Sequence, residues 1–240
     1  MALAAAAALV GAAVQSATGF GFALILSPAL LAALDPYEAV TALLALGVAL
    51  NLLVLVEGGT VRWRELVPVL AAAVPGLALG AVALELLDKP VLQIFVGVVV
   101  LLAASVQLRG RLTGRRVRRR SATAAGLASG ALTTSISVSG PPLVLWLESR
   151  GTAPAELRAT LAACFLALNL AGFLVLVPLA GVDRVAPAGV LLPLLGLVVA
   201  GHLAGARAFR RIDPRRFSLA VLALVAITGA ASVAAGTWAL

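Results

Sequence analysis

Two clusters of glycine and small polar residues lie inside apolar, charge-free stretches of this sequence. The first cluster, residues 15–22, lies within residues 1–34, and the second, residues 133–142, lies within residues 121–147. Hydroxyl and amide side chains can donate hydrogen bonds to oxyanions. A helix start adds unpaired N–H groups and a partial positive charge. The two clusters therefore predict a site that holds a small anion with neutral donors.

The residues predicted to bind the anion are those at two chain breaks, the polar residues beside them, and one amide in each half. Close packing of helices through small residues is the alternative role for the clusters, and an interhelical hydrogen bond is the alternative for the amides. Two equivalent clusters at chain breaks favour binding, whereas the role of the amides stays open. The candidates are Gln15, Thr18, Gly19, Phe20, Gly21, Phe22 and Asn51, and then Thr134, Ser137, Ser139, Gly140, Pro141, Pro142 and Asn169.

The composition indicates that these clusters lie in a membrane. Of the 240 residues, 62% are hydrophobic and 12% are charged, and the mean hydropathy is +1.11. A soluble domain of this size could not cover so much apolar surface. The formal charge of +8 comes from arginines in short loops, which is typical of membrane topology rather than of nucleic-acid binding. We expect an all-α polytopic protein of the cytoplasmic membrane, with lipid as its surroundings.

The charge-free stretches are too long to be single spanning helices. Residues 1–34 would form a helix of about 51 Å at about 1.5 Å per residue, against a hydrocarbon core of about 30 Å. We therefore predict that each stretch is a hairpin of two short helices, broken at Gly19–Phe22 and at Ser139–Pro142. Paired breaks of this kind are typical of transporter binding sites.

The two halves of the chain repeat the same order of elements. A shift of 118 residues places the first break on residues 137–140, Asn51 on Asn169, Pro36 on Pro154 and Pro75 on Pro193. These matches predict an internal duplication. Besides the hairpins, the predicted spans are residues 39–56, 66–87, 91–108, 159–182, 185–206 and 217–240.

The arginine-rich segments predict how the halves are related. Residues 109–120 contain seven arginines and residues 207–216 contain five, so both segments are expected in the cytoplasm. They can share a side only if residues 121–147 return to the side they entered from. Each half is then a broken helical hairpin plus three transmembrane helices, and the halves are inverted repeats. The expected domains are residues 1–108, a basic cytoplasmic loop at 109–120, and residues 121–240.

Other chemistry is not indicated. No metal-binding cluster, nucleophile–base pair or nucleotide-binding loop is apparent, so we expect no enzyme activity, no metal and no cofactor. The Gly76/Gly80 and Gly201/Gly205 pairs are expected to be packing seams. His202 could relay protons, but a structural or interfacial role is favoured because the equivalent position lacks a histidine.

The residues at the two breaks, with the proline that follows the first, resemble the sulfite exporter TauE/SafE family of membrane permeases. The resemblance covers essentially the whole chain, and it implies a permease for sulfite, sulfonates or related anions. Where the second motif often has a run of glycines and a later proline, this chain has residues 137–140 and Trp146. The resemblance adds Pro28 to the candidates and supports Gly19, Phe20, Gly21, Ser139, Gly140 and Pro142.

The sequence therefore predicts a secondary permease that works by alternating access on a small anionic substrate. A passive anion channel and a membrane scaffold without transport activity are the alternatives. A second copy of the chain is a candidate partner, and nucleic acid is not.

Overall fold

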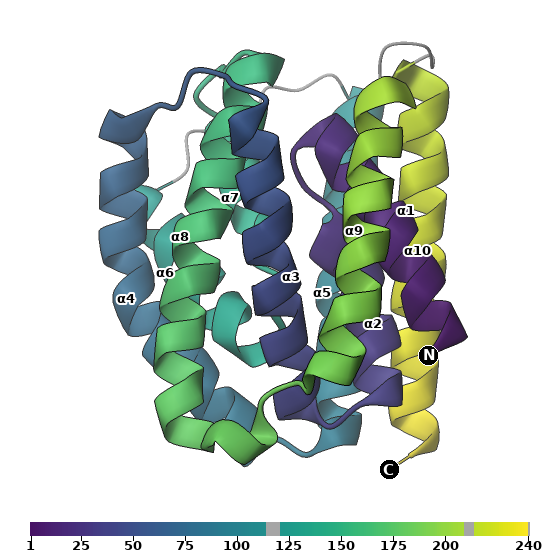
Figure 1. The fold of residues 1–240 in the computed structure, drawn as a ribbon. Coiled ribbons are helices and arrows are strands. Elements are labelled where there is room, and N and C mark those ends of the chain that lie inside the picture. Colours follow the sequence, from purple (N-terminus) through teal and green to yellow (C-terminus); the bar gives the residue numbers. More distant parts are fainter. Residues whose placement is uncertain (114–120, 209–213, 240) are drawn as a thin grey trace.

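The computed structural model describes residues 1–113, 121–208 and 214–239, and these residues contain helices and no strands (Figure 1). Within these residues, ten α-helices and one short 3-10 helix follow one another. They are α1 (Ala2–Thr18), α2 (Phe22–Ala33), α3 (Pro36–Val56), α4 (Trp63–Leu86), α5 (Lys89–Thr113), α6 (Ala122–Ile136), α7 (Gly140–Glu148), α8 (Pro154–Ala180), η1 (Val182–Arg184), α9 (Ala188–Ala208) and α10 (Pro214–Trp238).

Among the described residues, five helices are long and apolar enough to cross a membrane, namely α3, α4, α5, α8 and α9. The helices of the two charge-free stretches are shorter, with 17 and 12 residues in α1 and α2 and 15 and 9 in α6 and α7. The protein is therefore an all-helical, multi-pass membrane protein, as predicted. The central residues of the basic loop, 114–120, fall outside the described residues, as do residues 209–213.

The first short-helix pair is broken where the sequence predicts it. The second is broken at residues 137–139, slightly before the predicted Ser139–Pro142, because the two prolines lie in the first turn of α7. Helix α1 ends at Gly19, with φ 89°, and α2 begins after Gly21, with φ 115°. Helix α6 ends at Ser137, with φ 59°, and α7 begins at Gly140. A left-handed residue commonly ends a helix, and glycine adopts that conformation without steric cost. The two breaks occupy equivalent positions at the shift of 118 residues.

Several helices begin earlier than the predicted spans. Helices α3, α8 and α10 begin at Pro36, Pro154 and Pro214, and α5 begins at Lys89, just before a proline. Proline fits the first turn of a helix, because its missing N–H would have no partner there and its φ angle is already helical. The prediction placed each start at the first apolar residue and so missed this polar first turn.

The repeat continues beyond α8 at a larger shift. Helices α4 and α9 begin 125 residues apart, because α8 has 27 residues where α3 has 21 and the connection that follows it is one residue longer. At this shift Gly76 and Gly80 match Gly201 and Gly205. Pro193 then matches Pro68, so the predicted match between Pro75 and Pro193 is wrong.

Each half packs its second long helix on the first short helix of the other half: α4 lies against α6, and α9 lies against α1 (Figure 1). A Cβ atom on Gly76 would lie 2.2 Å from the carbonyl oxygen of Leu127, and one on Gly201 would lie 2.2 Å from that of Leu9. Leu9 and Leu127 are themselves equivalent. The predicted glycine seams are therefore confirmed, and they allow the helix backbones to approach closely.

Equivalent helices run in opposite directions in Figure 1, where the chain ascends in α3 and α9 and descends in α8 and α4. Inverted repeats require opposite directions of this kind. The orientation of each half relative to a membrane stays a prediction.

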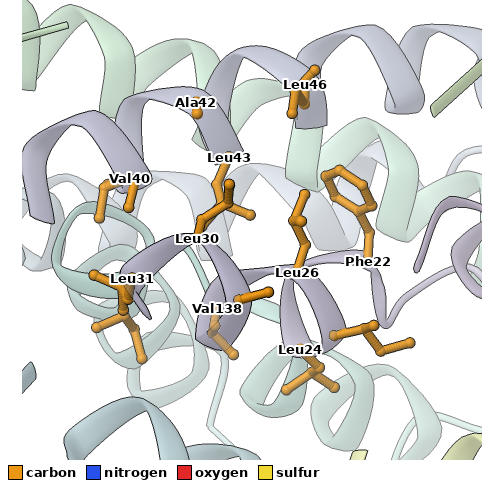
Figure 2. Packing of buried hydrophobic residues seen from close by; sticks show 14 of the residues in the cluster. Phe22, Leu24, Leu26, Leu30, Leu31, Val40, Ala42, Leu43, Leu46 and Val138 are labelled. Atoms are coloured by element: carbon orange, nitrogen blue, oxygen red, sulfur yellow. The ribbon is translucent and has the colours of Figure 1, made fainter. Parts of the chain in front are cut away.

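The core holds the second break against the first hairpin. Leu26 and Leu30 of α2 face Leu43 of α3, and Val138 from the second break packs beside them (Figure 2). The Ser27 hydroxyl donates to the carbonyl oxygen of Ile136 at 3.0 Å. These contacts fix the start of α7 next to the start of α2.

Candidate anion-binding site

A small cavity of about 30 Å³ lies where the two breaks meet α3 and α8. The predicted residues that line it come from both halves. No acidic or basic side chain lines it. The lining residues are Gln15, Gly21, Phe22, Ala23, Leu24, Leu43, Gly47, Asn51, Ser137, Val138, Ser139, Gly140, Phe165 and Asn169.

On the side of the first half, two amides bind each other and the backbone. The Gln15 Nε2 group donates to Asn51 Oδ1 at 2.9 Å, and Gln15 Oε1 accepts from the N–H of Phe22 at 3.3 Å. The Asn51 Nδ2 group donates to the carbonyl oxygen of Gly47 at 2.7 Å. This amide pair ties α1, the start of α2 and α3 together, so it positions the cavity wall.

On the side of the second half, three polar side chains face the cavity without a hydrogen bond to any described residue. Asn169, Ser137 and Ser139 are only 7%, 5% and 6% exposed. None of their polar atoms is among the fully buried atoms without a partner, so each keeps some accessible surface beside the cavity. Three unpaired donors around one cavity therefore indicate a place for a polar ligand.

The predicted duplication allows Asn169 to be compared with Asn51. The residue equivalent to Gln15 is Thr133, and its hydroxyl donates to the carbonyl oxygen of Ser129 at 2.6 Å, so it forms no second clamp. Gly47 leaves space for the free amide, because a Cβ atom there would lie 2.3 Å from Asn169 Nδ2.

The two helix starts offer different donors. The first-turn N–H groups of a helix have no partner within it, and Ala23 and Leu24 in the first turn of α2 line the cavity. Helix α7 carries Pro141 and Pro142 in its first turn, and proline has no N–H. The hydroxyls of Ser137 and Ser139 stand beside that start instead. The site therefore combines backbone donors from one break with side-chain donors from the other.

Some predicted binding residues lie outside the cavity. The Thr18 hydroxyl donates to the carbonyl oxygens of Val14 and Phe20, and the Thr134 hydroxyl donates to that of Leu77 at 2.7 Å. A Cβ atom on Gly19 would lie 2.9 Å from the Cα of Arg158, so Gly19 contacts α8. Phe20 packs against buried apolar side chains of the core, and Pro28 is buried within α2. Pro141 and Pro142 line an apolar groove between α5 and α6. A contact of these residues with substrate stays a prediction.

The sequence reasoning missed several lining residues. Ala23, Leu24, Leu43, Val138 and Phe165 are apolar, and nothing in their types distinguishes them from the core. Gly47 had a usable signal, because it lies one helical turn before Asn51 in an otherwise apolar helix.

Charged residues gather at the two ends of α3, away from the cavity. At its start, the Tyr37 hydroxyl donates to Glu85 at 2.5 Å, and Arg184 lies 3.5 Å from the same carboxylate. At its end, Glu57 forms an ion pair with Arg158 of α8. The cavity is therefore neutral and lies between two charged ends.

The comparisons with known proteins agree with this architecture. A family model described as sulfite exporter TauE/SafE matches residues 3–232, a span that includes both breaks and every residue lining the cavity. Neither the comparison with curated proteins nor the comparison with solved structures found a match.

Proposed function

The chain belongs to the sulfite exporter TauE/SafE family, and we propose that it carries a small sulfur oxyanion, such as sulfite or a small sulfonate, across the cytoplasmic membrane. The observation that carries this proposal is the set of three unpaired donors, Asn169, Ser137 and Ser139, around a small neutral cavity between the two breaks.

The donors suit an oxyanion. An anion in the cavity would accept hydrogen bonds from the Asn169 amide and the two serine hydroxyls, while the first-turn N–H groups of α2 contribute the partial positive charge of a helix start. Each neutral hydrogen bond contributes about 0.5–1.5 kcal/mol net. Several weak donors hold a substrate loosely enough for release in each cycle, which a carrier requires.

The size of the cavity limits the substrate. A water molecule needs about 10–15 Å³ on this measure, so about 30 Å³ leaves space for only a few heavy atoms. The proposed substrate is therefore a small head group, and a long organic tail would require the cavity to widen.

Alternating access between inverted repeats is the proposed mechanism. Its support is that the cavity takes residues from both halves, that equivalent helices run in opposite directions, and that each half packs on the other through the same glycine seam. Two equivalent arrangements of the halves would expose the cavity to opposite sides of the membrane in turn.

Transport by purified protein in proteoliposomes tests this function. We expect saturable sulfite uptake and counterflow, and competition by thiosulfate or small sulfonates. Asn169→Leu removes the free amide in a side chain of similar size and should weaken apparent affinity by about two- to twelvefold.

Ser105→Ala is the control, because the Ser105 hydroxyl is bonded to the carbonyl oxygen of Leu101 in α5, outside the cavity. Its apparent affinity should equal that of the wild type. Conductance without saturation would identify a channel instead, and wild-type affinity in Asn169→Leu would place the substrate elsewhere.

A further inference from the structure

His202 of α9 is buried, with 4% of its surface exposed, and both of its ring nitrogens have partners. Its Nδ1 atom lies 2.8 Å from the hydroxyl oxygen of Ser16 in α1, and its Nε2 atom lies 3.1 Å from Oε1 of Glu57. Glu57 also forms an ion pair with Arg158. This histidine connects a charged helix end to a buried hydroxyl, and whether its role is structural, interfacial or proton relay stays a prediction.

This connection leads from solvent toward the cavity. Glu57 caps the end of α3 and is exposed, whereas Ser16 is buried. Ser16 lies in the last turn of α1, three residues before Gly19, and follows Gln15, the cavity residue that holds the start of α2. Arg158, the other partner of Glu57, packs its backbone on Gly19 at the same break. A change of charge at His202 would therefore act on the hairpin that forms one wall of the cavity.

The other half of the molecule shows the same seam without a histidine. At the equivalent positions, the Thr134 hydroxyl donates to the backbone carbonyl of Leu77 at 2.7 Å. Leu77 occupies the position of His202, and it is buried in the same way. A leucine therefore suffices to pack this seam, so packing alone does not require an imidazole at position 202.

The surroundings of the ring accommodate both of its protonation states. In the neutral ring, Nε2–H donates to Glu57 while the Ser16 hydroxyl donates to Nδ1. In the protonated ring, Nδ1–H donates to the Ser16 oxygen, which can accept as well as donate. Taking up one proton thus reverses the direction of the hydrogen bond to α1 and leaves both ring nitrogens paired.

Few other charges face this ring. Helices α1 and α3 pack against α9, and among their side chains and caps Glu57 is the ionisable group that contacts His202. Arg158 of α8 reaches the same carboxylate. On α9 itself, Arg207 is exposed and donates to the carbonyl oxygen of Leu203. A charge on His202 would therefore interact mainly with Glu57 and Arg158.

We propose that His202 is the proton-binding site that couples anion transport to a pH gradient, with Glu57 as the route by which the proton enters from solvent. The proposal rests on the proposed carrier function. One proton is taken from water at the face where α3 and α9 end, is held on the imidazole, and is released after the conformational change. Because the cavity has no positive side chain, a protonated His202 favours the loaded anion, so proton and anion move together.

The experiment separates coupling from exchange in proteoliposomes loaded with sulfite. The wild type should accumulate labelled sulfite when a pH gradient is imposed, and it should exchange sulfite when no gradient is present. His202→Gln keeps hydrogen-bonding groups but cannot titrate. It should retain exchange within about twofold of the wild type and lose the accumulation driven by the pH gradient.

Two further variants complete the test. His202→Leu reproduces the packing of Leu77 and should show the same loss of coupling, so it serves if His202→Gln does not insert. Ser105→Ala, which removes a hydroxyl bonded to the carbonyl oxygen of Leu101 away from His202 and from the cavity, should keep full coupling. Sulfite itself can take up a proton near neutral pH, but this contribution is equal in the wild type and the variants.

Accumulation in His202→Gln or His202→Leu equal to that of the wild type would overturn the coupling proposal and leave the carrier function standing. Wild-type exchange that does not respond to a pH gradient would do the same. Absence of exchange in the wild type would instead overturn the carrier function itself.

Discussion

Ser137 combines a strained backbone with a hydroxyl in the cavity, and two substitutions separate these properties. It is the one residue other than glycine with positive φ in the described part of the chain, at 59°. A left-handed conformation costs an L-residue about 1–2 kcal/mol. Ser137→Gly removes this cost, but it also destabilises the folded state by about 0.5–1 kcal/mol, because glycine is more flexible in the unfolded chain. Ser137→Ala keeps the strain.

The expected stabilities follow from these terms. Ser137→Gly should be more stable than the wild type by about 0.5 kcal/mol, with a range of about 0–1.5 kcal/mol. Ser137→Ala should not gain this stability. Both variants lose the hydroxyl, so both should bind the anion about two- to twelvefold more weakly, in keeping with a loss of about 0.5–1.5 kcal/mol.

Thermal unfolding in detergent and apparent transport affinity in proteoliposomes measure the two effects. Equal loss of affinity in both variants, with higher stability only in Ser137→Gly, is the expected result. Wild-type affinity in both variants would refute a contact between this hydroxyl and the substrate. Weak binding in Ser137→Ala alone would show that the backbone, not the hydroxyl, matters at this position.

Two glycines carry the remaining predictions. Gly21→Val should abolish transport while the protein still inserts. The φ angle of Gly21 is 115° and a Cβ atom would lie 2.9 Å from Cγ1 of Val14, so the local cost is roughly 1–3 kcal/mol. Normal uptake by this variant would show that the first break is not part of the binding site. Gly201→Ala should lower thermal stability by about 1–3 kcal/mol, because its Cβ would lie 2.2 Å from the carbonyl oxygen of Leu9. Gly196→Ala in the same helix is the control, since no atom lies within 4 Å of its Cβ position.

The sequence was sufficient for the elements that depend on local chemistry. Glycine at 19 and 21 and the prolines after 140 end and restart helices through their own backbone preferences, so both breaks could be placed. The long apolar runs between arginine-rich segments similarly predicted the spans. Helix starts at Pro36 and Pro154 were placed too late, because a polar first turn carries no hydropathy signal although proline favours it.

The partners of polar side chains could not be predicted in this way. Thr18 and Thr134 have the same donor as Ser137, yet their hydroxyls are used by backbone carbonyls. Ser16 and His202 lie 186 residues apart and meet only because α9 packs on α1. Whether a donor is free for a ligand depends on such tertiary contacts, which the sequence pattern does not contain.

The predicted duplication makes the differences between the halves informative. Equivalent seams such as Gly76 on Leu127 and Gly201 on Leu9 are the same in both halves, as packing between helices requires. Polar bonding departs from the repeat at the two sites that matter for the proposals. Asn169 is unpaired where Asn51 is clamped, and His202 lies where the other half has Leu77. Packing cannot explain these departures, since the other half packs without them. Substrate binding and proton coupling are functions that need only one site in each molecule, so they can break the symmetry where packing cannot.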